Sequence, residues 1–124
     1  MRNSRYTSLA RTLFSPFPAT ITIFVTNRCN ARCRMCFNWE DLNNDDIDLL
    51  SLEEYENIAR NIGHLHALII SGGEPFLRKD LPEIISAFNR HAGTRQVAIP
   101  TNGFSKDIPE MCERIFNDNP HVFF

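Results

Sequence analysis

The amino-acid sequence predicts an α/β fold in which parallel strands alternate with helices. Short apolar runs alternate along the chain with longer segments whose apolar residues recur at helical spacing. Each of these longer segments begins at a serine or an aspartate, which are residues that suit a helix N-terminus. Repeated strand–helix units of this kind form a parallel sheet with helices packed outside it.

The first strand is expected at residues 20–26, where threonine, isoleucine and valine predominate. A long connection follows, and the first helix begins at Ser51, which forms a capping box with Glu54. Gly63 is suited to ending this helix. The helix has one apolar stripe, formed by Leu52, Tyr55, Ile58, Ala59 and Ile62.

The second strand is a short, continuous apolar run at residues 67–70, as in a strand buried in a parallel sheet. The second helix begins at Asp80 and ends near Gly93. Its opening, Asp-Leu-Pro-Glu, reappears in the third helix as Asp-Ile-Pro-Glu from Asp107. Aspartate at the cap and proline in the first turn predict the same capping chemistry at both helices.

The third strand is expected at residues 96–99, between these two helices. Residues 117–120 contain asparagine and proline, which end the third helix. The apolar residues 122–124 begin a fourth strand.

The composition limits the classes of function that we expect for this chain. The chain has 124 residues, 43% of them hydrophobic and 23% charged, as in a one-domain globular protein. A net charge of -2 gives no basic field that favours nucleic acid, and no apolar run approaches the roughly 20 residues that span a bilayer. The four cysteines, without a secretory signal, favour metal ligands in a reducing compartment, so we expect a cytoplasmic protein.

The beginning of the chain differs from the rest in charge. Residues 1–39 contain six arginines and no acidic residue. Apolar spacing over residues 6–14 predicts a lead-in helix ended by Pro16 and Pro18, with an organelle transit peptide as the alternative. We therefore expect a basic lead-in at residues 1–18 and the main unit at residues 19–124.

Three cysteines, Cys29, Cys33 and Cys36, follow the first strand with the spacing C-x3-C-x2-C. Clustered thiolates are soft ligands that favour iron–sulfur clusters. A cubane cluster has four irons, so three cysteines leave one iron open for chemistry. A zinc site with His64 or Cys112 as fourth ligand is an alternative, although Cys112 lies on an apolar helix face, and three ordinary thiols are another.

Two more motifs follow the next two strands. Ser71-Gly72-Gly73-Glu74-Pro75 comes after the second strand, and Pro100-Thr101-Asn102-Gly103 comes after the third. In a βα architecture the loops that follow the strands share one rim, and active sites form there. The three motifs are therefore expected to converge in space.

Together the cysteine spacing, the Gly-Gly-Glu-Pro segment and the Thr-Asn-Gly segment resemble the radical S-adenosylmethionine (SAM) superfamily. The resemblance implies a partial (β/α) TIM-like barrel. This chain would supply its N-terminal half, with about three βα units and the start of a fourth strand in residues 19–124. It also implies an enzyme in which a [4Fe–4S] cluster cleaves SAM reductively, and the resulting 5′-deoxyadenosyl radical abstracts hydrogen from a substrate.

The resemblance assigns Cys29, Cys33 and Cys36 as cluster ligands and no further catalytic residue. It places the remaining cofactor-binding residues around SAM: Met35, Gly72, Gly73, Glu74, Pro75, Thr101 and Asn102. Met35 stands where the family usually has an aromatic residue, and Thr101 with Asn102 also fits a plain Asn-Gly turn. Phe37 and Trp39 would either cover the site or pack within their own loop.

The implied partners are SAM, an unidentified peptide or small-molecule substrate, and a reductase or a flavodoxin- or ferredoxin-type electron donor. Arg28, Arg32 and Arg34 would face that donor or simply lie in a solvated loop. The family's later motifs do not occur in the sequence, so substrate choice is not readable. A non-catalytic iron–sulfur fragment and a zinc-binding interaction module remain the alternative functions.

Overall fold

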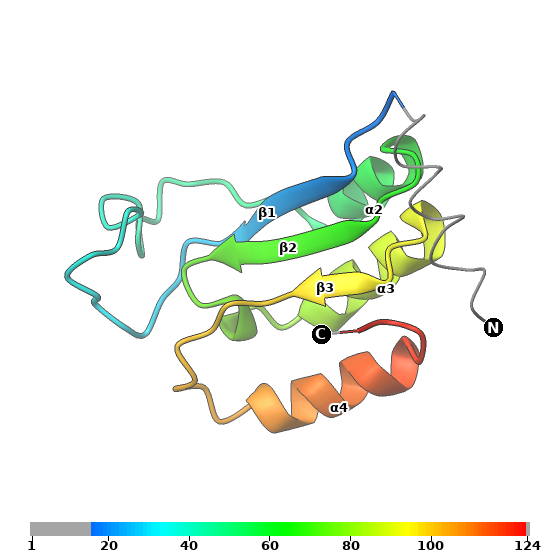
Figure 1. The fold of residues 1–124 in the computed structure, drawn as a ribbon. Coiled ribbons are helices and arrows are strands. Elements are labelled where there is room, and N and C mark those ends of the chain that lie inside the picture. Colours follow the sequence, from blue (N-terminus) through cyan, green and yellow to red (C-terminus); the bar gives the residue numbers. More distant parts are fainter. Residues whose placement is uncertain (1–15, 124) are drawn as a thin grey trace.

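A computed structural model describes residues 16–123 as one parallel sheet covered by helices on one face (Figure 1). The strands are β1 (Thr20–Thr26), β2 (Ala67–Gly72) and β3 (Gln96–Ala98), in the order β1-β2-β3, and both pairings are parallel. This confirms the α/β class and the parallel sheet. The predicted helix at residues 6–14 lies outside the described residues, and the division at residue 18 stays a prediction.

Three helices follow the three strands in turn: α2 (Leu52–Asn61), α3 (Leu81–Ala92) and α4 (Ile108–Asp118). A short 3₁₀ helix, η1 (Pro75–Leu77), which the sequence did not indicate, lies between β2 and α3. The predicted order of elements is confirmed. The strand ends move by one or two residues, since β2 runs on to Gly72 and β3 ends at Ala98 rather than at residue 99. Among residues 16–123, no helix is long and apolar enough to cross a membrane.

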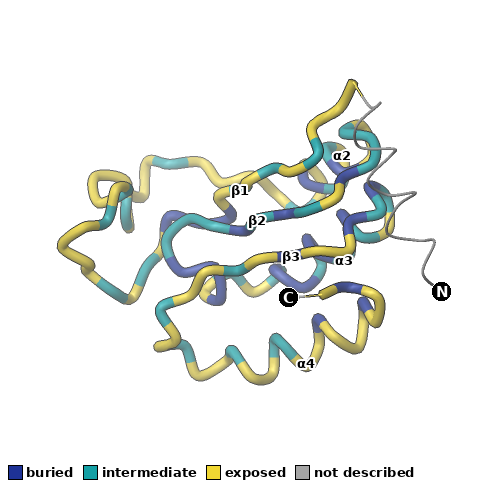
Figure 2. The backbone as a smooth tube through the Cα atoms, in the orientation of Figure 1, coloured by how far each residue is buried: buried dark blue, intermediate teal, exposed yellow. Residues whose placement is uncertain are grey.

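The core lies between the sheet and its helices. Leu68 and Ile70 of β2 are fully buried, and Tyr55 of α2 and Phe88 of α3 pack in the same cluster. Along β1 the exposed side chains of Thr20, Thr22 and Phe24 alternate with less exposed ones, as expected for a strand with one open face. Figure 2 shows buried residues along β2 and α3, whereas α4 and the long connection after β1 are mostly exposed or intermediate.

Local capping chemistry explains where two of the helices begin and end. Ser51 accepts the amide of Glu54, and the Glu54 carboxylate accepts the amide of Ser51, which confirms the predicted capping box. These hydrogen bonds lower the pKa of the exposed Glu54 carboxyl. Gly63 follows α2 and Gly93 ends α3, with φ of 77° and 67° respectively, in the left-handed region that glycine adopts easily.

The capping prediction for Asp80 and Asp107 is wrong in one respect. Neither side chain accepts a hydrogen bond from its own helix, although each helix carries a proline in its first turn. The Asp80 carboxylate instead accepts hydrogen bonds from Arg78, at 2.8 and 3.0 Å. A charged guanidinium therefore takes the place of the helix amides at Asp80.

A single parallel bridge forms at Phe123, within the segment where the sequence predicts a fourth strand. Phe123 pairs in parallel with Gln96, its amide donates to the carbonyl of Arg95 at 2.7 Å, and its carbonyl accepts the amide of Val97 at 2.9 Å. The described residues thus contain a three-stranded sheet and the first parallel bridge to a fourth segment.

Candidate functional site at the carboxyl ends of the strands

The loops that follow β1, β2 and β3 meet at the carboxyl end of the sheet (Figure 1). The turn after β2 packs directly on the residues that leave β1. Gly73 donates its amide to the carbonyl of Thr26 at 2.7 Å, and Glu74 donates its amide to the carbonyl of Arg28 at 2.8 Å. This brings the Gly-Gly-Glu-Pro segment against the start of the cysteine loop, as the sequence predicted.

Glycine is required at this junction for two different reasons. Gly72 has a φ of 129°, and a β-carbon there would lie 2.2 Å from the Thr26 carbonyl oxygen. Gly73 does not have a positive φ, but a β-carbon there would lie 2.2 Å from the Arg28 carbonyl oxygen. Both glycines therefore allow two backbone segments to approach more closely than any side chain permits.

The Glu74 side chain joins the second motif to the third. Only 1% of Glu74 is exposed, and its carboxylate accepts hydrogen bonds from three groups. These donors are the Phe76 amide at 3.2 Å, the Thr101 hydroxyl at 2.8 Å and the Asn102 amide at 2.8 Å. A buried carboxylate is costly unless it is hydrogen-bonded, and here both of its oxygens are satisfied by the protein.

The third motif in turn reaches the cysteine loop. The side-chain nitrogen of Asn102 donates to Asn30 Oδ1 at 2.8 Å and lies 3.9 Å from the sulfur of Cys29. The predicted convergence of the three motifs is therefore confirmed by hydrogen bonds that link all three loops. Thr101 and Asn102 also form the local turn that the sequence allowed, because they accept the amides of Gly103 and Phe104.

The cysteines lie on one accessible loop. All of them are free thiols: Cys33 is exposed, and Cys29 and Cys36 are partly exposed. A hydrogen bond of 3.2 Å from the Cys36 amide to the Cys33 carbonyl closes a turn between the last two. Three thiols on one loop are the donor set that an iron–sulfur cluster needs, so the residues fit such a group.

Among residues 16–123, no three histidine, cysteine or acidic side chains lie close enough together to share a metal ion. A [4Fe–4S] cluster binds each of its cysteine ligands through a different iron, so this finding concerns only a single shared ion.

Asparagine side chains tie this loop back to its own start, and the sequence did not indicate them. The Asn27 side chain donates to the carbonyls of Asp41 and Asn44, at 3.2 and 2.6 Å. Asn43, with a φ of 59°, accepts the Cys29 amide at 3.1 Å and donates to the Cys29 carbonyl at 3.2 Å. The one available signal was the Asn43-Asn44 pair, because asparagine tolerates the left-handed region.

Arg78 stabilises the backbone next to this junction. Its guanidinium donates to the carbonyls of Val25 and Leu50, at 2.7 and 2.8 Å, and stands 5.1 Å from the centre of the Tyr55 ring. Val25 lies at the register shift between β1 and β2, where a bulge frees its carbonyl from the regular ladder. The Arg78 guanidinium also holds the pKa of the Asp80 carboxyl below its usual range.

Met35 and the aromatic residues near the cysteines are mostly exposed. Met35 is 93% exposed and Trp39 67% exposed. Phe37 meets Phe24 edge to face, with 6.1 Å between the ring centres, on the uncovered face of the sheet. Arg32 and Arg34 are exposed, whereas Arg28 forms an ion pair with Asp45.

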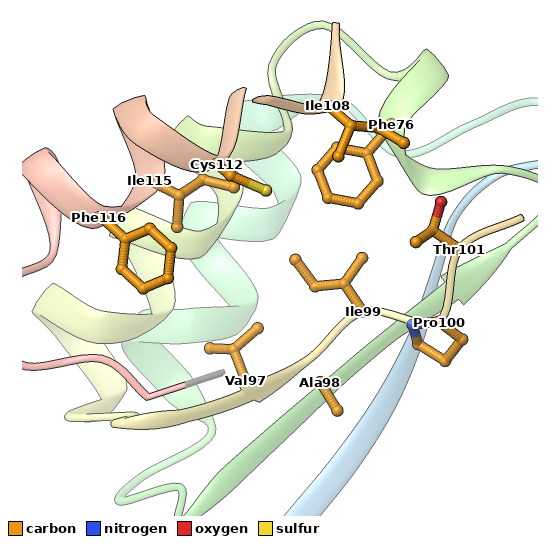
Figure 3. Close-up of a pocket in the computed structure, with 10 residues that line it drawn as sticks. All are labelled: Phe76, Val97, Ala98, Ile99, Pro100, Thr101, Ile108, Cys112, Ile115 and Phe116. Atoms are coloured by element: carbon orange, nitrogen blue, oxygen red, sulfur yellow. The ribbon is translucent and has the colours of Figure 1, made fainter. Parts of the chain in front are cut away.

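Cys112 belongs to a different part of the molecule. It lines an apolar cavity of about 500 Å³ between α4 and the segment from β3 to Thr101 (Figure 3). Val97 and Ile99 point toward α4 in this view, whereas Ala98 and Pro100 point away. Burial raises the pKa of the Cys112 thiol, so this side chain behaves as part of the apolar packing.

Comparison with known proteins agrees with the resemblance seen in the sequence. Residues 23–123 match the family model of the radical SAM superfamily. The chain is 39% identical over 90 residues to the GTP 3′,8-cyclase of Staphylococcus carnosus, a match that covers 67% of this chain and 26% of the relative. Another relative, the GTP 3′,8-cyclase of Cronobacter sakazakii, is 31% identical over 99 residues, covering 75% of this chain and 30% of the relative. The chain thus spans between a quarter and a third of the length of these relatives.

Proposed function

This chain belongs to the radical SAM superfamily, and on that premise we propose that it is the cluster-bearing part of a radical SAM enzyme. In this proposal Cys29, Cys33 and Cys36 hold a [4Fe–4S] cluster whose fourth iron binds SAM. When bound, that cluster supplies the electron that cleaves SAM to methionine and a 5′-deoxyadenosyl radical, which abstracts hydrogen from the substrate.

The observation that carries the proposal is the junction built around Glu74. One buried carboxylate connects the turn after β2 to the turn after β3, and Asn102 continues the connection to the loop of Cys29. Polar groups held at the carboxyl ends of parallel strands are placed where βα proteins bind ligands. The parallel pairing of β1 with β2 and of β2 with β3, together with the parallel bridge from Gln96 to Phe123, also supports the proposal that this sheet is the first part of a (β/α) barrel.

We place SAM against this junction. The backbone of Gly72, Gly73, Glu74 and Pro75 is the surface for its amino group, because no side chain intervenes at the two glycines. Glu74 and Thr101 hold this surface in place, because the Thr101 hydroxyl already donates a hydrogen bond to the Glu74 carboxylate. Asn102 lies at the same edge, and the exposed Met35 is free to cover the adenine. The electron donor is a reductase or a flavodoxin- or ferredoxin-type protein that reaches the exposed cysteine loop.

For the substrate we propose a guanine nucleotide. The support is that two relatives, at 39% and 31% identity, are GTP 3′,8-cyclases. If this holds, GTP should increase the formation of 5′-deoxyadenosine by the reduced, SAM-loaded protein more than ATP does. Equal stimulation by the two nucleotides would count against a guanine site.

The cluster is tested first, by anaerobic reconstitution of the chain with iron and sulfide, metal analysis, and EPR of the reduced protein. We expect about four irons and four sulfides per chain, and an EPR signal that shifts when SAM is added. Cys33→Ser should lose the cluster. Cys112→Ala, a cysteine change distant from the loop, should keep it.

The alternative functions give different results. Zinc without sulfide would identify the zinc-binding module. A cluster signal that does not respond to SAM would identify a non-catalytic iron–sulfur fragment. Equal loss of iron in Cys33→Ser and Cys112→Ala would contradict the assigned ligand set.

A further inference from the structure

The side-chain amide of Asn102 has a fixed orientation. Its oxygen accepts the amide of Phe104 at 2.9 Å, so the oxygen end is identified by a donor that only an acceptor can satisfy. The NH₂ group therefore points the other way, toward Asn30 Oδ1 at 2.8 Å and the Cys29 sulfur at 3.9 Å. An NH₂ group has two hydrogens, so it can serve both acceptors at once.

Glu74 fixes the backbone that carries this amide. One carboxylate oxygen accepts the backbone N–H of Asn102, and the other accepts the Thr101 hydroxyl, both at 2.8 Å. Glu74 is itself fixed, because it is 1% exposed and its own amide donates to the Arg28 carbonyl. Glu74 thus binds the backbone of Asn102, and the side chain of Asn102 in turn lies against the sulfur of Cys29.

We propose that Asn102 donates an N–H···S hydrogen bond to the Cys29 thiolate and thereby raises the reduction potential of the cluster. Glu74 is the positioning residue that holds Asn102 in place. This inference rests on the proposed function, since it requires Cys29 to be a cluster ligand. Hydrogen bonds to ligand sulfurs are one of the means by which proteins set cluster potentials. A donor at sulfur stabilises the more negative, reduced state, so it makes reduction easier.

The test is an EPR-monitored redox titration of the reconstituted chain without SAM. Loss of one such hydrogen bond in Asn102→Ala should make the cluster about tenfold harder to reduce, which is a potential about 59 mV more negative. Asn89→Ala is the matched control, because Asn89 donates a 2.8 Å hydrogen bond to the Thr94 carbonyl, at the opposite end of the fold. The control should leave the potential unchanged.

Glu74→Gln tests the positioning role. Glutamine keeps the shape but replaces one acceptor oxygen with an NH₂ group that faces donors. Removing the carboxylate's negative charge raises the potential by itself, with or without Asn102, whereas loss of the positioning lowers it only when Asn102 is present. The shift caused by Glu74→Gln should therefore be more negative in the unaltered chain than in Asn102→Ala. Additive shifts would mean that Glu74 acts on the cluster independently of Asn102 and would overturn the positioning role.

A second readout does not depend on the cluster. In the metal-free chain, the ¹H–¹⁵N signal of the Asn102 side chain should move in Cys29→Ala and in Glu74→Gln, but not in Cys112→Ala. An unmoved signal in the first two variants overturns the inference. So does an unchanged potential in Asn102→Ala with a full cluster, and in that case the proposed function stands. Failure of the unaltered chain to take up iron and sulfide instead counts against the proposed function, while the NMR result still decides the Asn102–Cys29 contact.

Discussion

Gly73 lies so close to Arg28 that a β-carbon on the glycine would stand 2.2 Å from the arginine's carbonyl oxygen. The contact joins the end of β2 to the residue just before Cys29, and it is reinforced by the 2.8 Å hydrogen bond from the Glu74 amide to the same oxygen. The position of the cysteine loop therefore depends on a backbone-to-backbone contact.

Gly73→Ala should cost about 3 kcal/mol or more of unfolding free energy, because backbone on both sides has to move. Gly103→Ala is the control, since a β-carbon there meets nothing within 4 Å and only its φ of 76° opposes the change. That control should cost about 1–2 kcal/mol. Urea unfolding of both variants measures the difference, and equal costs would show that the Gly73 contact relaxes easily.

Arg78→Met should destabilise the fold by about 2–4 kcal/mol, because it leaves the carbonyls of Val25 and Leu50 without their donor. Arg78→Lys should recover only part of this loss, since an ammonium cannot reproduce the fork that holds Asp80. Arg60→Met is the control: Arg60 forms an exposed pair with Glu56, worth under about 1 kcal/mol. Denaturant midpoints close to that of Arg60→Met in the Arg78 variants would contradict the role given to Arg78.

Asp80 should make stability depend on pH in the acid range. Its folded-state pKa is lowered by the Arg78 guanidinium, so its contribution is present above its unfolded pKa of about 3.9 and is lost as pH falls through the lower folded value. The gap in unfolding free energy between the unaltered chain and Asp80→Asn should therefore narrow below about pH 4. The Asp80 side chain is 38% exposed, so salt should reduce the gap as well.

The control for this pH effect is the same substitution in an Arg78→Met background. Without the guanidinium, Asp80→Asn should produce almost no pH-dependent difference. A difference that persists there would assign the acid dependence to another carboxylate.

Asn43→Ala should cost about 1–2 kcal/mol, because the side chain both accepts from and donates to the backbone of Cys29 and because alanine is strained at a φ of 59°. Asn43→Gly should cost less, since glycine removes the strain. Asn44→Ala is the neighbouring control, with only a local hydrogen bond from the Asp46 amide to lose. Denaturant unfolding of the three variants measures these losses of stability. A larger loss for Asn44→Ala than for Asn43→Ala would contradict the role given to the Asn43 side chain.

The sequence was sufficient for the elements because their signals are local. Apolar runs located β1 and β2, the Ser51–Glu54 capping box located the start of α2, and Gly93 located the end of α3. The convergence of the three motifs also followed from order alone, because loops after parallel strands share one edge. The extent of each strand was less certain, since β3 ends one residue early.

The groups that hold the site together were not predictable, because their partners are distant backbone atoms. Arg78 reaches a carbonyl 53 positions earlier, and Asn27 reaches one 17 positions later, and neither contact leaves a spacing pattern. The capping error at Asp80 has a related cause, since a neighbouring arginine outcompeted the helix amides. Glu74 was assigned to the cofactor from its motif, whereas its three internal hydrogen bonds show a bridging role as well.

The side-chain hydrogen bonds of Asn27 and Asn43 join the two ends of residues 27–44, so this segment is a closed loop that begins where the chain leaves β1. For such a loop the entropic cost of closure rises only logarithmically with its contour length, about 0.6 kcal/mol for each doubling. Lengthening the stretch between Cys36 and Asp41 would thus leave the sheet nearly unaffected. The fold can carry cysteine loops of very different size while keeping the attachment points, and therefore the first cysteine, in the same place.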